Sequence, residues 1–400
     1  MKKVKLGVSL YPEQETTEQI DHYLKTASGY GFENVFTSLF SVNGTREEVV
    51  AYFKKLTDIA HTYGMKVSGD CNSGFFQKYG ATPEDLSLFR EMGIDILRID
   101  FCFRDERDAA LINNQQGIGI EMSSAMPDAI AKAIENGADP KRITAVHNFY
   151  PQRYTGISSR AVRELNSTCQ KLGVGSGIFV TSTQPGTHGP WPVSDGLPTM
   201  EMDRTLPIAL QVKHCLALDN IDEIYIGDAF ATDEELRSVA EVMQHVYTNV
   251  PRLEGLDPSF AFIADFLPHG DLKRIPLDVE LVAGLNATEQ EIILQYPVHS
   301  VSPDSSEYML RSRWTRILYG RKEIPCRRTC QKMFHRGDVV IVNDNLKHYR
   351  GEVQIILQDM AVDGQRNLVG RIAEDELFLL ELLQDSHDFA NAKNFCFVAL

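Results

Sequence analysis

Three acidic residues stand at matching places along the chain, each at the end of a short apolar run. Asp70 follows residues 65–69, Asp100 follows 96–99 and Glu121 follows 117–120. If these runs are barrel strands, their alternating apolar residues face the surrounding helices and the acidic side chains face the interior. Carboxyl groups gathered in this way can act as a general acid with a base or nucleophile, or can hold magnesium or manganese. Each also has a structural alternative: Asp100, for example, could pair with Arg98 or cap the next helix.

Residues suited to binding a sugar or a phosphosugar follow several other runs. Segment 147–153, HNFYPQR, combines a ring nitrogen, an amide, two aromatic rings and a cation. A long loop near residue 190 contains a Trp, and a loop of about twenty residues in a compact domain is more often functional than not. Packing, capping and buried hydrogen bonds are the structural alternatives. The expected binding residues in this part of the chain are Tyr11, Glu13, His147, Asn148, Tyr150, Arg153, His188 and Trp191.

The strongest concentration of positive charge lies between residues 311 and 336. This segment holds nine basic residues and one acidic residue, Glu323, in a chain whose formal net charge is −15. A planar guanidinium can meet a phosphate with two parallel hydrogen bonds, so Arg311 and Arg313 are expected to contact a phosphate. A solvated loop face is the alternative interpretation of the same segment.

The composition argues against several classes of protein. An excess of 55 acidic over 40 basic side chains disfavours a nucleic-acid partner, and an apolar fraction of 43% excludes a disordered chain. The apolar runs are strand-sized and none follows Met1 directly, so we expect neither a membrane partner nor a signal peptide. Seven scattered cysteines with no C-x-x-C pair indicate reduced thiols in a cytoplasm. Nucleotide-binding, serine-hydrolase and zincin motifs are missing, and we expect no cofactor.

The elements that would position these residues form a repeated unit. In the first 250 residues, eight short apolar runs each precede a helical pattern, which predicts an α/β fold, a (β/α)₈ TIM barrel. The eight runs cover 4–10, 34–39, 65–69, 96–99, 117–120, 143–146, 175–180 and 223–226. The expected domains are a barrel over 1–250, a linker over 251–270 and a β domain over 271–400.

The last 130 residues follow a different pattern. Short β-rich runs, separated by Gly, Asp and Asn turns, predict a small closed all-β domain with one short helix over 374–383. The runs cover 278–283, 292–296, 339–342, 352–357 and 368–372.

Several short segments together resemble the bacterial 6-phospho-N-acetylmuramidase family, over essentially the whole chain. They are LGVSLYPE (6–13), RID (98–100), NN (113–114), GIE (119–121), HNFYPQ (147–152), GPW (189–191), DGL (195–197) and YRGEVQI (349–355). The resemblance implies a TIM-type barrel followed by a cyclophilin-like β domain. It also implies exo-hydrolysis of the bond between 6-phospho-N-acetylmuramic acid and N-acetylglucosamine during cytoplasmic recovery of cell-wall sugars.

The leading hypothesis is therefore a glycosidase that acts on a small-molecule phosphosugar without a metal or cofactor. Glu121 with Asp100 or Asp70 would supply the acid and the nucleophile or base, and attack by the substrate's 2-acetamido group is a third route. A metal-dependent phosphosugar isomerase, epimerase or lyase could use the same carboxylates. A non-enzymatic phosphosugar-binding protein is the remaining alternative. The oligomeric state is left open, a homo-oligomer included.

Overall fold

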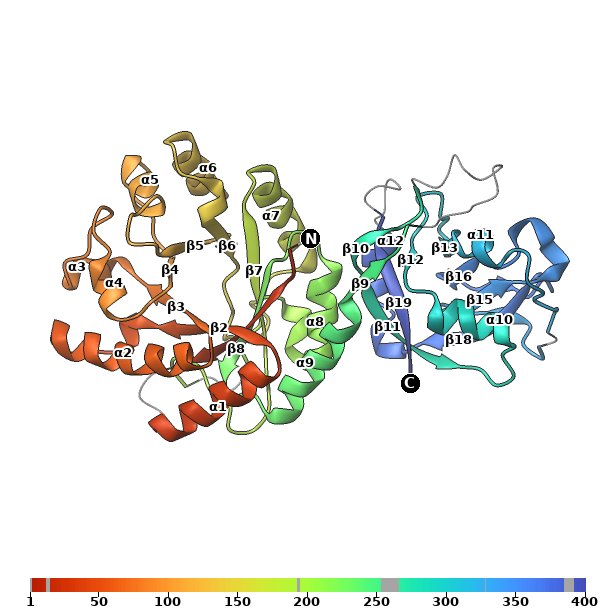
Figure 1. The fold of residues 1–400 in the computed structure, drawn as a ribbon, viewed down its shortest axis with the longest axis horizontal. Coiled ribbons are helices and arrows are strands. Elements are labelled where there is room, and N and C mark those ends of the chain that lie inside the picture. The colour runs from red at the N-terminus through yellow and green to blue at the C-terminus, as the bar shows by residue number, and fades with distance from the viewer. Residues whose placement is uncertain (1, 12–14, 193–194, 253–265, 328, 385–391) are drawn as a thin grey trace. The chain divides into compact units, whose positions relative to one another are not determined.

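The computed structural model describes residues 2–11, 15–192, 195–252, 266–327, 329–384 and 392–400. These residues form two compact units, 2–240 and 241–400. Figure 1 shows helices around the strands of the first unit and a sheet in the second.

The first unit is a closed barrel of eight parallel strands in the order β1 to β8, so the predicted TIM-type barrel is confirmed. The strands are β1 (Lys5–Leu10), β2 (Phe32–Ser38), β3 (Lys66–Cys71), β4 (Ile96–Ile99), β5 (Gly119–Ser123), β6 (Ile143–Val146), β7 (Gly175–Val180) and β8 (Glu223–Ala229). The helices are α1 (Thr17–Gly29), α2 (Arg46–Thr62), α3 (Ser73–Lys78), α4 (Ser87–Glu91), α5 (Glu106–Ile112), α6 (Pro127–Glu135), α7 (Ser159–Lys171), α8 (Ile208–Ala217) and α9 (Asp233–Val246).

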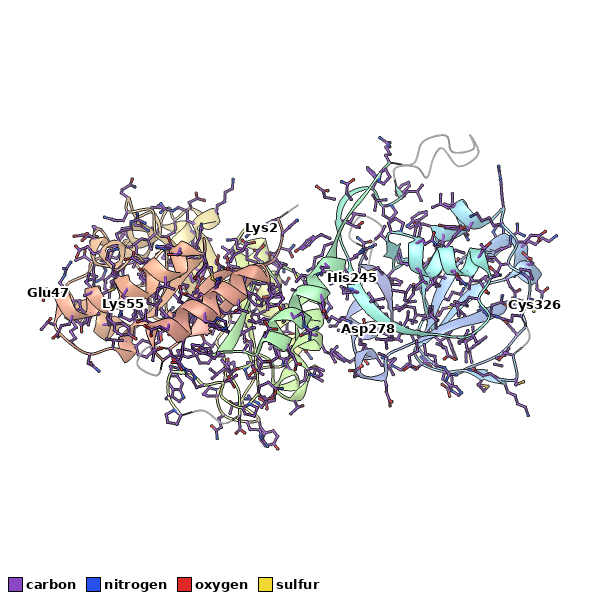
Figure 2. The ribbon with its side chains drawn as sticks, turned by 60° about the horizontal axis from the view of Figure 1, so that its bottom comes forward. Lys2, Glu47, Lys55, His245, Asp278 and Cys326 are labelled. Carbon is purple, nitrogen blue, oxygen red and sulfur yellow. The ribbon has the colours of Figure 1, made fainter. Side chains whose placement is uncertain are left out.

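Local signals explain where the outer helices begin. Thr16 caps α1 and Thr45 caps α2, each in a reciprocal capping box with the Gln or Glu three residues later. The apolar side of α2 is buried against the barrel, whereas Glu47 and Lys55 are exposed on its outer side (Figure 2). Such amphipathic helices cover the barrel wall and leave its carboxyl end to the loops.

The tilt of the strands sets the height of each inward side chain. Asp70 pairs in register with Arg98, and Arg98 pairs with Glu121. In an eight-stranded barrel, such a row of partners descends toward the amino ends of the strands from one strand to the next. Glu121 therefore lies deeper than Arg98, and Arg98 lies deeper than Asp70. The contact between Glu121 and Ser68, two residues before Asp70, agrees with this order.

The second unit is built on a seven-stranded sheet in the order β12-β19-β11-β18-β15-β16-β13. Its strands are β11 (Ile275–Leu281), β12 (His299–Ser300), β13 (Met309–Ser312), β15 (Asp338–Val342), β16 (Val353–Ile356), β18 (Arg366–Ile372) and β19 (Asn394–Ala399). A two-stranded sheet joins β14 (Met333–Phe334) to β17 (Met360–Ala361). The helices are α10 (Ala287–Gln290), α11 (Thr315–Tyr319) and α12 (Leu379–Gln384).

Three details of the second unit differ from the sequence-based predictions. The sequence predicts one short helix over 374–383, whereas the described residues contain α10, α11 and α12, the last over Leu379–Gln384. The sequence predicts a strand over 292–296, but α10 continues through this run as a π-helical turn over Glu291–Gln295. The sheet is also not closed by a ladder between its edge strands β12 and β13. Instead, the amide of Ser302 donates to the carbonyl of Arg311 at 2.8 Å, and His299 contacts the Ser312 hydroxyl at 3.1 Å.

The boundary between the units falls within α9. Strand β9 (Tyr247–Val250) pairs with β10 (Gly270–Lys273), and Arg274 donates to the carbonyl of His245, which Figure 2 labels near the end of α9. These contacts place the last turn of α9 in the second unit. The expected linker over 251–270 lies mostly at residues 253–265, which are outside the described parts of the chain.

Candidate active site

Asp70 and Arg98 form a buried ion pair near the carboxyl end of the barrel. Arg98 donates from Nη1 to Oδ1 of Asp70 at 2.7 Å and from Nη2 to the side-chain carbonyl of Asn148. Burial raises the pKa of Asp70 above its ordinary value, and the positive charge of Arg98 opposes that rise. The predicted residues Asp70 and Asn148 are thus brought together by a shared guanidinium.

Asp100 follows β4 and is exposed. Asp70 pairs in register with Arg98, two residues before Asp100, so the two acidic residues lie at the ends of neighbouring strands, and the negative charge of Asp100 further raises the pKa of Asp70. No hydrogen bond or ion pair engages the Asp100 carboxylate within the described residues. Ion pairing with Arg98 or capping of α5 is therefore not its role: Arg98 pairs with Asp70, and Asp105 caps α5.

Glu121 points into the barrel, as its alternation with Ile120 predicts, but it is 1% exposed. Ser68 donates to one of its oxygens at 2.7 Å and Tyr225 to the other at 3.2 Å. Burial, and then the nearby Glu223, raise the pKa of Glu121 to about 8, so it is protonated at neutral pH. The geometry does not bring it level with Asp70 and Asp100.

His147 lies on the helix side of β6. Its Nε2 contacts the Asn166 side chain of α7 at 2.8 Å, and its Nδ1 contacts the Ser124 hydroxyl at 2.7 Å. Burial lowers its pKa to about 4, so the ring is neutral. Both ring nitrogens are occupied within the wall, and the structure does not bring His147 to the mouth.

Aromatic rings line the mouth near β6 and β7. Tyr11 is 2% exposed, packs among core rings and donates its hydroxyl to the carbonyl of Gly227, so it supports the floor of the site. Phe149 packs on the same core, and Trp191 lies against it with ring centroids 6.4 Å apart while remaining 44% exposed. A supported, partly exposed indole of this kind can stack on a sugar ring.

The loops after β6 and β7 are clamped by a buried arginine. Arg204 donates to the carbonyl oxygens of Tyr150 and Asp195 and to both oxygens of Glu201. Glu201 in turn accepts from the amides of Tyr154 and Gly156, and Arg204 lowers its pKa to about 2.

Two exposed side chains lie on the loop that Arg204 and Glu201 hold in place. Tyr154 is 84% exposed, and its backbone is in the left-handed region with φ of 70°. The predicted phosphate contact Arg153 is exposed and pairs with Asp195 at 2.7 Å. The rigid backing under both residues makes this rim suitable for contacting a ligand.

The predicted residue His188 pairs at the mouth with Glu15, which sequence reasoning missed. Their Oε1 and Nε2 atoms are 2.9 Å apart, and His188 stacks on Phe230. Burial raises the pKa of Glu15 to about 7 and lowers that of His188. No sequence motif marks Glu15, because its raised pKa comes from burial in the folded protein. The predicted neighbour Glu13 lies outside the described residues.

The remaining predicted residues, Arg311 and Arg313, lie in the second unit. Arg311 forms a two-pronged ion pair with Glu352, and Arg313 pairs with Asp304 at 2.7 Å. Across the described residues, no group of three or more His, Cys, Asp or Glu side chains is arranged to hold a metal ion. The proposed ligand set Asp70, Asp100 and Glu121 is separated by depth, as described above.

Comparison with known proteins identifies the family. The family models described as 6-phospho-N-acetylmuramidase, N-terminal, and 6-phospho-N-acetylmuramidase, C-terminal, match residues 6–241 and 275–390. The chain belongs to the 6-phospho-N-acetylmuramidase family. The family name denotes a glycosidase. The N-terminal match covers most of the first unit, and the C-terminal match lies within the second unit.

Solved structures share the fold of this chain over nearly its whole length. An uncharacterized B. cereus protein is 32% identical, with a TM-score of 0.78 and coverage of 99% of both chains. A conserved Enterococcus faecalis protein of unknown function is 23% identical, with a TM-score of 0.61 over 99% of this chain and 96% of that one, and supports the fold alone. No curated protein matches the chain significantly. Among the helices of the described residues, none is long and apolar enough to cross a membrane.

Proposed function

We propose that this protein hydrolyses the glycosidic bond between 6-phospho-N-acetylmuramic acid and N-acetylglucosamine at the mouth of its barrel. The observation that carries the proposal is the exposed Asp100 carboxylate beside the buried Asp70. Glycosidases commonly need one carboxyl group that holds a proton and a second that is ionised. Membership of the 6-phospho-N-acetylmuramidase family supports the substrate class.

The two carboxyl groups would divide the work according to their surroundings. Asp70, held as a carboxylate by Arg98 at 2.7 Å, would be the ionised group that activates a water or stabilises the positive charge of the transition state. The exposed Asp100 would act as the general acid or orient the substrate's 2-acetamido group. Arg98 would hold Asp70 in place, and protonated Glu121 would support this layer from below as a positioning residue. Trp191 would stack on a sugar ring, with Phe149 behind it.

The finer features implied by the family resemblance remain part of this proposal. They are a cytoplasmic role in cell-wall sugar recovery and a likeness of the second unit to cyclophilin. The domain boundaries near residues 250 and 271, expected from the change in sequence pattern, stay a prediction. Arg311 and Arg313 remain proposed contacts for the phosphate.

The test is incubation of the full chain with 6-phospho-N-acetylmuramyl-N-acetylglucosamine and mass detection of the released monosaccharides. We expect release without added metal and in the presence of a chelator, and the anomer formed first, read by NMR, reports retention or inversion. Loss of activity with the chelator would favour the metal-dependent alternative. Tight binding without release would favour a binding protein.

A further inference from the structure

Three arginines of the second unit gather around two carboxylates. Arg311 lies in β13, Arg316 lies in α11, and Arg313 lies between these elements, which Figure 1 labels. We call these three residues the arginine cluster. Their side chains are 19%, 24% and 25% exposed for Arg311, Arg316 and Arg313, so each is largely buried but reaches solvent.

Glu352 is the central acceptor of the cluster, and Arg311 and Gln354 are its hydrogen-bond donors. Oε1 accepts from Nε of Arg311 at 2.7 Å and from Gln354 at 2.9 Å. Oε2 accepts from Nη2 of Arg311 at 3.0 Å. Nη1 of Arg316 stands 3.7 Å from Oε2, beyond hydrogen-bond distance, and is buried without a hydrogen-bond partner among the described residues. A buried donor in this state favours an additional acceptor.

The charges in the cluster do not balance. Asp304 pairs with Arg313 at 2.7 Å and with Arg311 at 3.4 Å, so two carboxylates face three guanidinium groups. Burial, and then the positive charge of Arg313, lower the pKa of Arg316 below its ordinary value. One further negative charge would relieve this repulsion.

An aromatic ring orients two of the guanidinium groups. The guanidinium carbons of Arg311 and Arg316 lie 5.7 and 5.5 Å from the centre of the Tyr349 ring. The shared ring limits the positions of both groups, so less conformational freedom is lost when an anion binds.

We propose that the arginine cluster is an anion-binding site for a phosphate monoester, with Arg316 as the main donor. A phosphate offers several acceptor oxygens to the planar donors of Arg316 and Arg313, and its charge exceeds the single positive charge left over by the cluster. The identity of the natural ligand, a sugar 6-phosphate, rests on the proposed function. Anion binding itself does not.

The test is calorimetric titration of the full chain with inorganic phosphate at constant ionic strength set with sodium chloride. Arg316→Gln should weaken phosphate binding about tenfold or more, because it removes charge-assisted hydrogen bonds. Lys332→Gln removes the same charge from an exposed residue in the same basic segment and should bind as the wild type does. Arg316→Lys keeps the charge without the planar fork, and we expect intermediate binding.

Absence of phosphate binding in the wild type, or equal affinity in Arg316→Gln and Lys332→Gln, would overturn the proposal. If Arg316→Gln does not fold, Arg316→Lys decides, and unchanged affinity there contradicts the assignment of Arg316. The titration needs no turnover, so the two proposals can fail separately. If the protein binds phosphate at Arg316 but does not cleave the disaccharide, the anion site stands and the proposed hydrolase function is wrong. If it cleaves the disaccharide but binds no phosphate, the hydrolase function stands and the anion site is wrong.

Discussion

Arg98 holds the carboxylate of Asp70 at 2.7 Å, and Asp100, two residues after Arg98, stands exposed beside the same pair. The barrel mouth therefore presents one fixed, buried carboxyl group and one accessible carboxyl group. This difference leads to different expectations for the two residues.

Asp100→Asn should lower kcat by about 10²–10⁴, as expected for loss of a group that acts in proton transfer or attack. Because Asp100 is exposed, its variant should keep the thermal stability of the wild type. Asp70→Asn should lower kcat similarly but also destabilise the fold by about 3–5 kcal/mol, because it leaves buried Arg98 without its ionic partner. Steady-state kinetics and thermal unfolding of both variants check this. A folded Asp100→Asn protein with near wild-type kcat would remove Asp100 from the chemistry.

Glu121→Gln separates a catalytic role from a positioning role. We expect kcat to fall by less than about tenfold, since the side chain lies below Arg98, whereas a group active in proton transfer would cost 10²–10⁴. The raised pKa of about 8 means that, between pH 4.5 and 8, the folded state binds more protons than the unfolded state. The free energy of unfolding should therefore fall as pH rises through this window.

The Gln side chain does not titrate, so this contribution is lost from the variant. Relative to the wild type, Glu121→Gln should become more stable as pH is raised from 5 to about 9. Thermal unfolding of both proteins at pH 5, 7 and 9 measures this difference. Parallel curves would show that Glu121 is not protonated in the fold, and a kcat loss above 10² would restore it as a reacting group.

Glu121 and His147 show what alternation along a strand predicts and what it does not. The alternation correctly points Glu121 inward, but its depth depends on the tilt of the strands, which shifts paired residues from β3 to β5. The position of His147 just after a strand end predicts a mouth residue. In the structure its neighbour Val146 belongs to the inner core, so the alternation turns His147 toward the helices.

The error at residues 292–296 has a different cause. A short, mostly apolar run such as IILQY fits either a strand or a buried helix, and the choice depends on flanking signals. Asn286 and Glu289 form a capping box at the start of α10, which extends into this run. That signal was present in the sequence, whereas the raised pKa of Glu15 depends on burial and could not be predicted from it.

Glu15→Gln should alter the pH dependence of substrate binding. The pKa of Glu15 is about 7, so above that pH the mouth gains a negative charge. The proposed substrate carries a phosphate and a lactyl carboxylate, and the added charge would repel both. KM should rise above pH 7 in the wild type and stay level in Glu15→Gln. Glu18→Gln, in the exposed first turn of α1, is the matched control and should retain the wild-type rise. Identical KM profiles in all three proteins would contradict the prediction.

Two substitutions of Tyr154 should affect substrate binding equally but stability differently. Its backbone has φ of 70° and is held there by the carboxylate of Glu201, while its ring is 84% exposed. A non-glycine residue in this region costs about 1–2 kcal/mol, and such strain persists mainly where a function requires the side chain. Tyr154→Gly and Tyr154→Ala both remove the ring, but Gly alone removes the strain. If the ring contacts the sugar, both variants should raise KM to a similar extent while Tyr154→Gly has the higher melting temperature. An unchanged KM in both would show that the exposed ring does not contact the substrate, whereas equal melting temperatures would show that the backbone stores no strain at this position.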